Sequence, residues 1–216
     1  MNNKLVGYYI NLNKRSDRKE HFENLKKEYS FLSNIERMEA IYSDSYGVGC
    51  LLSHIKCLQN FLESDNKQEY YAVFEDDYCI LNKENFIEFI NEFDKIKDNS
   101  NWDIITLTPR GKTIQKNKIN NFHKIIDSRT ATGYIIKHSF LEILLKNYKE
   151  NVIKLMKGYN GPEPNPYVTD QCWKVLQEKY NFIYFHKIYG GQLPSYSDIE
   201  KQYVNYNQRF LQQVYF

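Results

Sequence analysis

The apolar residues of the chain follow two alternating periodicities. Short runs rich in β-branched and aromatic residues, such as LVGYYINL and YYAVF, are typical of strands. Between them lie longer segments whose apolar residues recur every three or four positions, as in helices. This alternation favours an α/β fold with a mostly parallel central sheet flanked by helices. At 216 residues the chain fits one compact domain, so we expect a single domain over residues 1–216.

The predicted elements follow one another closely along the sequence. Strands are expected at residues 5–12, 35–41, 70–74, 103–107, 122–126, 132–136 and 182–185. Helices are expected at residues 16–29, 47–62, 86–93, from 139 onward, and 169–180. Asp17 and Glu20 have capping-box spacing at the start of the first helix. We expect a polar loop at residues 109–121 and leave the tail beyond Asp198 unassigned.

The clearest chemical signal is the triplet Glu75-Asp76-Asp77, which directly follows the predicted strand 70–74. In open parallel sheets, ligands bind at the carboxyl ends of the strands. Clustered carboxylates repel one another unless a cation neutralises them, and Mg²⁺ and Mn²⁺ commonly bridge carboxylates to substrate phosphates. The chain has no G-x-G-x-x-G or G-x-x-x-x-G-K-[ST] motif, so a bound diphosphate would depend on a metal and cationic side chains. Taken alone, the triplet fits a solvated turn equally well.

Charge and composition exclude some classes of protein. The 29 basic and 27 acidic residues give a net charge of +2, which gives no ground for a nucleic-acid partner. No run approaches the roughly 20 apolar residues that span a bilayer, and the N-terminus lacks the apolar core of a signal peptide. We therefore expect a cytoplasmic protein without a transmembrane segment.

The four cysteines show no C-x-x-C pairing, and we expect reduced, mostly buried thiols. Cys50, His54 and Cys57 share one face of a predicted helix, where neighbouring turns offer metal ligands. The same helix is apolar almost all round, which favours a buried structural helix over a zinc site.

Six motifs occur in order along the chain: YYINLNKRSDR, GVGCLLSHIKCL, YAVFEDD, ATGYIIKHSFLEILL, TDQ and PSYSDI. In these motifs the sequence resembles glycosyltransferase family 25, which includes bacterial lipooligosaccharide galactosyltransferases and collagen hydroxylysine galactosyltransferases. The resemblance covers almost the whole chain. Its specific part is GC-x-x-SH followed by an apolar strand and EDD.

The resemblance implies a GT-A (Rossmann-like) fold and an inverting glycosyltransferase. Its members move a hexose, galactose or glucose, from a UDP-sugar to a hydroxyl of a glycan or hydroxylated peptide acceptor, as in lipopolysaccharide biosynthesis. The implied cofactor is Mn²⁺ or Mg²⁺. Two alternatives are a catalytically degenerate nucleotide-sugar-binding module and another metal-dependent nucleotide enzyme such as a nucleotidyltransferase. The first is disfavoured because all the acids remain, and the second leaves GC-x-x-SH and SDI unexplained.

The resemblance also implies a set of site residues. EDD resembles the DXD motif of GT-A enzymes, so Asp77 and Glu75 are expected at the metal. His186 matches, by position only, a late histidine that joins the metal in other GT-A families. The expected donor-binding residues are Asn11, Arg15, Arg18, Ser53, His54, Asp76, Gln192, Ser197 and Asp198.

Asp170, in the TDQ motif, is the favoured general base. An inverting transfer needs a carboxylate to take the proton of the acceptor hydroxyl. The alternative role for Asp170 is a charge in the first turn of its helix. Glu75 and Asp76 are the alternative bases, if the metal is held by the other acids.

Overall fold

A mixed β-sheet forms the centre of the computed structural model, which describes residues 4–45, 47–99, 101–111 and 114–207. Within these residues the sheet has eight strands in the order β2-β1-β3-β10-β5-β11-β8-β7. Their bounds are β1 (Val6–Asn11), β2 (Asn34–Glu39), β3 (Tyr70–Glu75), β5 (Ile104–Thr106), β7 (Ile114–Ile119), β8 (Phe122–Ile125), β10 (Gly133–Lys137) and β11 (Phe182–Phe185).

Most of these strands run in one direction, as the sequence predicts. β1 pairs in parallel with β2 and β3, and β11 pairs in parallel with β5. β10 and β8 run against their neighbours, which makes the sheet mixed. The carboxyl ends of β1 and β3 therefore meet at one edge, where Ile10 lies opposite Glu75.

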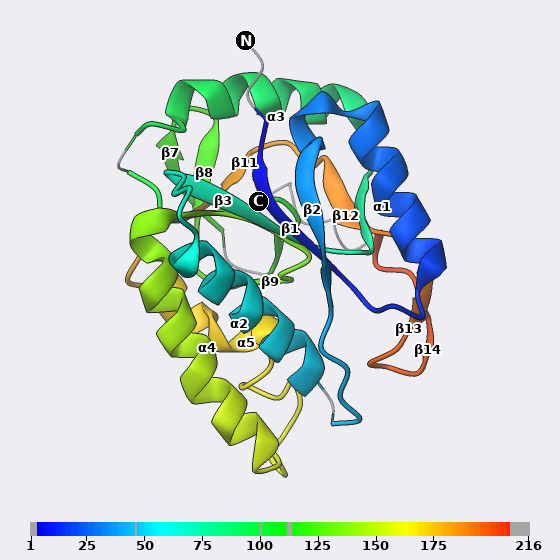
Figure 1. Cartoon of the computed structure of the whole chain (residues 1–216). Coiled ribbons are helices and arrows are strands. Elements are labelled where there is room, and N and C mark those ends of the chain that lie inside the picture. Colours follow the sequence, from blue (N-terminus) through cyan, green and yellow to red (C-terminus); the bar gives the residue numbers. More distant parts are fainter. Residues whose placement is uncertain (1–3, 46, 100, 112–113, 208–216) are drawn as a thin grey trace.

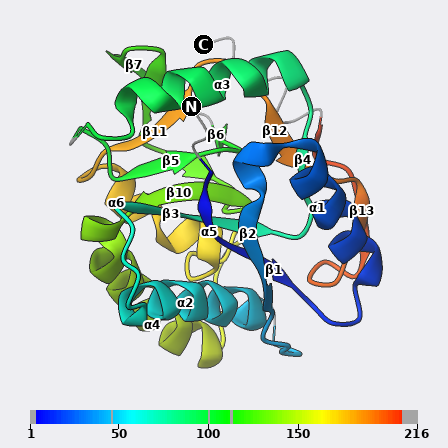
Figure 2. The same cartoon turned by 45° about the horizontal axis from the view of Figure 1, so that its top comes forward.

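Helices cover both faces of the sheet. α1 (Ser16–Glu28) and α3 (Lys83–Ile96) lie on one side, whereas α2 (Val48–Glu63) and α4 (Leu141–Met156) lie together on the other (Figures 1 and 2). Each pair buries its apolar stripe in a separate core. Phe22, Phe86 and Phe89 belong to the first core, and Leu51 and Leu144 belong to the second.

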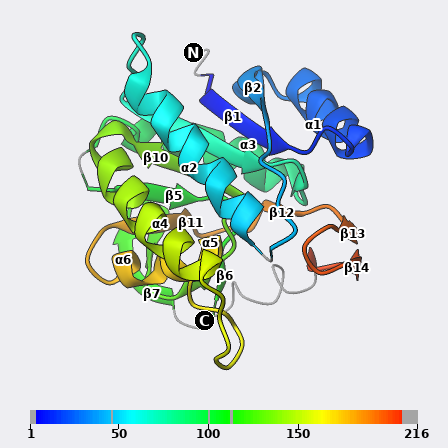
Figure 3. The same cartoon turned by 60° about the horizontal axis from the view of Figure 1, so that its bottom comes forward.

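Short elements surround the edge of the sheet at which β1 and β3 end. β4 (Tyr78–Ile80) pairs with β12 (Gly190–Gln192), β6 (Arg110–Gly111) pairs with β9 (Ser128–Arg129), and β13 (Ser195–Ser197) pairs with β14 (Gln202–Val204). The hairpin of β13 and β14 lies beside the start of α1 (Figures 1 and 3). Short helices complete the described residues: α5 (Thr169–Cys172), α6 (Lys174–Gln177) and two 3₁₀ turns at Ser30–Leu32 and His138–Phe140.

Three local predictions differ from the structure. The expected loop at residues 109–121 contains β6 and β7, apart from residues 112 and 113, which lie outside the described residues. The expected helix at 169–180 is two short helices separated at Trp173, whose buried indole donates a hydrogen bond to the Ser128 carbonyl at 3.2 Å. Asp17 does not cap α1, because its carboxylate binds the Arg15 guanidinium instead.

The tail beyond Asp198, which the sequence left unassigned, contributes β14. In the described part of the chain, no helix combines the length and the apolar character needed to cross a bilayer.

Candidate active site

A cavity of about 850 Å³ lies at the carboxyl edge of β1 and β3. Its walls come from both ends of the chain, because α1, α2, α5 and the hairpin of β13 and β14 all contribute. Eleven of the thirteen predicted site residues line it: Arg15, Arg18, Ser53, His54, Glu75, Asp76, Asp77, Asp170, Gln192, Ser197 and Asp198. The structure therefore brings together residues that are far apart in the sequence.

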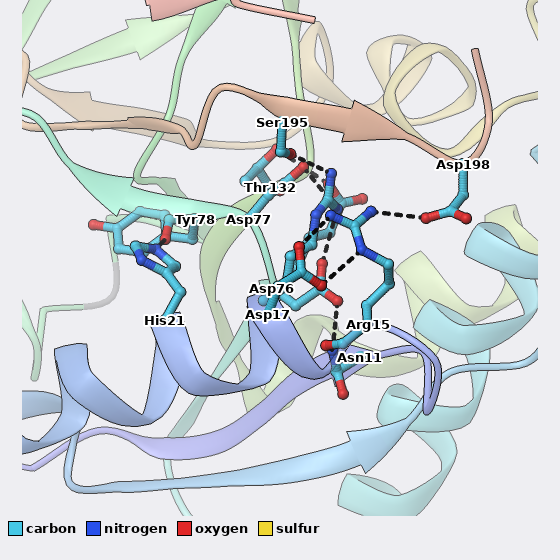
Figure 4. Close-up of polar contacts among 12 residues, drawn as sticks. Asn11, Arg15, Asp17, His21, Asp76, Asp77, Tyr78, Thr132, Ser195 and Asp198 are labelled. Carbon is cyan, nitrogen blue, oxygen red and sulfur yellow. Dashed lines mark hydrogen bonds and ion pairs between the residues drawn. The ribbon is translucent and has the colours of Figure 1, made fainter. Parts of the chain in front are cut away.

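Asp76 is held in place by two side chains that the sequence predicted near it. The Arg18 guanidinium donates to one carboxylate oxygen at 2.9 Å. The Asn11 amide donates to the other at 2.7 Å (Figure 4). Arg37 in turn donates to the side-chain Oδ1 of Asn11 at 2.8 Å, and Arg18 also donates to the Ser195 hydroxyl. Burial raises the pKa of Asp76 in spite of these contacts. Asn11 is itself buried and positions Asp76 from outside the cavity lining.

Asp77 carries the least compensated charge of the triplet. Its Oδ2 lies 3.2 Å from the Arg18 guanidinium, whereas its Oδ1 is buried and accepts no hydrogen bond from any residue that the structure describes. Burial is the largest influence on this carboxyl and raises its pKa to about 7, although Arg18 and Gln192 act in the opposite direction. A buried carboxylate oxygen that lacks a donor, on a residue that lines the cavity, fits the oxygen ligand that a hard divalent cation prefers.

Glu75 turns toward different partners from those of Asp77. Its Oε1 lies 3.4 Å from both His54 Nε2 and Cys50 Sγ, and its Oε2 accepts from the Thr132 hydroxyl at 3.1 Å. Burial by itself would raise the pKa of Glu75, but hydrogen bonding and the charge of His54 hold it below the ordinary value. Glu75 therefore does not contact the charged groups around Arg18. These contacts do not support the prediction that Glu75 and Asp77 share a metal ion.

Arg15 joins α1 to the tail of the chain. Its guanidinium donates to the Tyr196 carbonyl and to Asp198, both at 2.8 Å, and it also binds Asp17 (Figure 4). Lys14 approaches the other oxygen of Asp198 at 2.7 Å. Burial opposes ionisation of Asp198, yet the hydrogen bonds from Lys14 and Arg15 lower its pKa. The positive charge of Arg15 and Arg18 at the start of α1 is therefore offset by acids of this chain.

Asp170 lies in the first turn of α5 and faces the cavity. One carboxylate oxygen accepts the Thr130 amide at 3.2 Å, and the other accepts the Gln171 side chain at 3.3 Å. Thr130 has a φ of 80°, which is strained for a β-branched residue. The Asp170 carboxylate therefore supports a strained backbone segment at the cavity wall.

Ser53 has a structural role in this arrangement. Its buried hydroxyl accepts the Ile41 amide at 2.8 Å and donates to the Gly49 carbonyl at 2.7 Å. Gly49 allows this close approach, because a Cβ there would lie 2.4 Å from the Ile41 oxygen. Gln192 and Ser197 line the cavity from β12 and β13.

His186 does not join the acidic triplet. It follows β11, and both β10 and β5 lie between that strand and β3. Three strand spacings amount to roughly 14 Å, far beyond the reach of a shared metal ion. The His186 ring donates instead to the Asn121 carbonyl at 3.0 Å, so the prediction of a metal role beside Asp77 does not fit this placement.

Two arginines of the cavity were missed from the sequence. Arg110 and Arg129 are opposite one another in the ladder of β6 and β9, and both line the cavity. They were missed because this part of the chain was interpreted as irregular. The helical spacing of Cys50 and His54 was visible in the sequence, but their contact with Glu75 was not. Cys57 stays out of this group, because its thiol contacts the Met38 sulfur at 3.5 Å.

Residues 23–157, more than half of the chain, match the sequence profile of glycosyltransferase family 25 (LPS biosynthesis protein). The chain belongs to this family. It is therefore a glycosyltransferase, and its family implies a nucleotide-sugar donor and a glycan acceptor. A search of curated protein sequences gave no significant match.

Solved structures show the fold of this family 25 chain. A glycosyltransferase involved in the glycosylation of the major capsid of PBCV-1 matches with a TM-score of 0.52 at 12% identity, over 97% of this chain and 89% of that chain. This likeness supports a GT-A-like fold. UDP-glucose pyrophosphorylase complexed with UDP-glucose matches with a TM-score of 0.44 at 12% identity, over 86% of this chain and 74% of that chain. Mannose-1-phosphate geranyltransferase from Thermus thermophilus also has a TM-score of 0.44, at 10% identity, over 85% and 60% of the two chains.

Proposed function

We propose that this chain transfers a hexose, galactose or glucose, from a UDP-sugar to a hydroxyl of a glycan or hydroxylated peptide acceptor, with inversion at the anomeric carbon. Family membership and the GT-A-like fold support the glycosyltransferase part of this proposal. The observation that carries the site is the buried Oδ1 of Asp77, which lacks a donor among the described residues and belongs to a side chain that lines the cavity at the carboxyl end of β3.

A divalent cation, Mn²⁺ or Mg²⁺, fits beside Asp77. Asp77 would provide the main oxygen ligand, with Asp76 next to it and Arg18 fixing both carboxylates. When bound, such a cation neutralises charge on the departing diphosphate. Arg110 and Arg129 add positive charge to the cavity wall, where they would attract the donor phosphates.

Asp170 is our proposed general base. Its carboxylate would accept the proton of the acceptor hydroxyl while that oxygen forms a bond to the anomeric carbon. The bond from this carbon to the donor diphosphate breaks on the opposite face, which inverts the configuration. Glu75 is the alternative base, but the contacts that lower its pKa also make it a weaker proton acceptor.

The proposal is tested with purified protein and a panel of UDP-sugars, acceptors and Mn²⁺. We expect UDP release that requires acceptor, stops with chelator and is lost in Asp77→Asn. The matched control is Asp65→Asn, which removes an exposed carboxylate from the loop before β3, at the opposite end of that strand from the triplet. No UDP release from any donor would reject the transfer, and pyrophosphate release from nucleoside triphosphates would instead indicate a nucleotidyltransferase.

The base assignment has a separate test. Asp170→Asn should keep its affinity for the UDP-sugar, measured calorimetrically, and lose at least about 100-fold in the rate of transfer. Glu75→Gln serves as the comparison. If Asp170→Asn transfers at the normal rate and Glu75→Gln does not, the base is Glu75.

A further inference from the structure

Three side chains of different chemistry converge where α2 meets the end of β3. Cys50 and His54 lie one turn apart on α2, and Glu75 is the last residue of β3. One ligand atom from each lies within 4.8 Å of the other two. The Glu75 carboxylate lies 3.4 Å from both the Cys50 sulfur and the His54 Nε2.

The distance between His54 and Glu75 suits coordination better than hydrogen bonding, and 3.4 Å between Cys50 and Glu75 suits either. An N–H···O hydrogen bond is commonly about 2.9 to 3.0 Å long, so a 3.4 Å contact between His54 and Glu75 is weak. Bonds from zinc to sulfur, nitrogen and oxygen of about 2.0 to 2.3 Å place ligands of a tetrahedral site about 3.4 to 3.6 Å apart. The observed contacts of Glu75 thus match two edges of such a tetrahedron.

His54 and Glu75 each have a second polar atom, and a neighbouring hydroxyl group lies within hydrogen-bond distance of it. His54 Nδ1 lies 3.1 Å from the Tyr134 hydroxyl, and both side chains are fully buried. The Thr132 hydroxyl donates to Glu75 Oε2 at 3.1 Å. Partners of this kind orient metal ligands before the ion arrives, and a His54 Nδ1–H that donates to the Tyr134 hydroxyl would leave Nε2 to the ion.

The group also has an open side, because Cys50, His54 and Glu75 all line the cavity. Three protein ligands with a free fourth position are typical of accessible zinc sites. A thiolate and an imidazole select a borderline-soft cation, whereas the carboxylates of Asp76 and Asp77 offer only oxygen. We therefore expect Glu75, together with Cys50 and His54, to favour a different metal ion from the one that Asp76 and Asp77 favour.

We propose that Cys50, His54 and Glu75 bind Zn²⁺ from the cavity, at a site separate from Asp76 and Asp77, and that the bound ion inhibits the enzyme. On binding, the Cys50 thiol releases its proton to solvent, and water occupies the fourth position. Inhibition follows because the ion and its bound water fill part of the cavity next to Asp170. Zinc binding itself does not depend on the proposed hexose transfer, so the two are tested separately.

The test uses metal-free protein in buffer with excess Mg²⁺, which keeps the oxygen-only carboxylates occupied. Co²⁺ replaces Zn²⁺ as a spectroscopic probe, because a thiolate ligand adds a sulfur-to-cobalt charge-transfer band in the near ultraviolet. Zn²⁺ affinity is then measured by competition with Co²⁺. The variants are Cys50→Ala, and Cys57→Ala as the matched control from the same helix, whose thiol contacts Met38.

Wild type and Cys57→Ala should show the charge-transfer band, and Cys50→Ala should lack it. Since loss of a neighbour that only orients a ligand costs about 10- to 100-fold in metal affinity, loss of the thiolate should weaken Zn²⁺ binding by at least about 100-fold. Equal Zn²⁺ affinity in wild type and Cys50→Ala, or a wild-type Co²⁺ spectrum without the sulfur band, overturns the proposal. If Cys50→Ala does not fold, Glu75→Gln takes its place and should weaken Zn²⁺ binding while retaining the sulfur band.

Discussion

Replacing Asp77 with asparagine removes a buried negative charge and keeps the shape of the side chain. In the metal-free protein, burial raises the pKa of Asp77 from 3.8 to about 7. Between these values the native state holds a proton that the unfolded chain has lost. By linkage, the contribution of Asp77 to stability therefore falls as pH rises through this window, which is the reverse of an acid in a salt bridge.

The size of the effect follows from the shift in pKa. Each pKa unit corresponds to about 1.4 kcal/mol, so ionised Asp77 destabilises the native state by roughly 4 kcal/mol at pH 8. At pH 5 the carboxyl is protonated in the native state but mostly ionised in the unfolded chain. Taking up this proton on folding lowers the stability of the native state by about 1.7 kcal/mol. The free energy of unfolding of Asp77→Asn, relative to that of wild type, should thus increase by about 2 to 3 kcal/mol from pH 5 to pH 8.

Urea unfolding in the presence of a chelator, at both pH values, measures this difference. The exposed variant Asp65→Asn should follow wild type at both. Adding Mn²⁺ at pH 8 should stabilise wild type and leave Asp77→Asn unchanged. A difference between Asp77→Asn and wild type that is the same at pH 5 and pH 8 would refute the reasoning, because the charge of Asp77 would then be compensated without a cation.

Three further substitutions test the packing of the site. Arg18→Met should lower the free energy of unfolding by about 3 to 5 kcal/mol in urea, because it leaves Asp76 and Asp77 buried without their shared cation; a loss below about 1 kcal/mol would contradict this. Gly49→Ala should lower it by about 1 to 3 kcal/mol in thermal unfolding, since the new methyl group would meet the Ile41 oxygen, and an unchanged transition would show that the loop yields. Thr130→Gly should raise it by about 1 kcal/mol by removing the strain at φ 80°, whereas a decrease would show that the threonine side chain contributes more than its backbone loses.

Most of the fold could be predicted because its inner strands are continuous apolar runs. β3 and β11 begin and end within a residue of their expected positions, since each is almost fully buried and its sequence is typical of such strands. β7 was missed because its sequence, IQKNKI, is mostly polar. It lies at the edge of the sheet with a single neighbour, where an apolar pattern is not required.

The site could be predicted only in part. The family's motifs pointed to Asn11, Arg18 and Asp76, and in the structure Asp76 contacts the other two. The sequence also indicated that the side chains of Glu75 and Asp76 point in different directions, because successive residues of a strand point to opposite faces. Nothing in the sequence indicated the contact of Glu75 with His54, since this contact depends on how α2 packs against the sheet.

The hydrogen bonds of Arg15 and Arg18 with the hairpin of β13 and β14 have a consequence for biosynthesis. The Tyr196 carbonyl and the Ser195 hydroxyl follow these arginines by 181 and 177 residues. At roughly 5 to 20 residues per second, a ribosome needs about 9 to 36 s to add that stretch. After residue 77 has been added and before residue 195 follows, a nascent chain has the acidic triplet but lacks the wall that β13 supplies. The lining of the cavity reaches Tyr206, so its wall is complete only when almost the whole chain has been made.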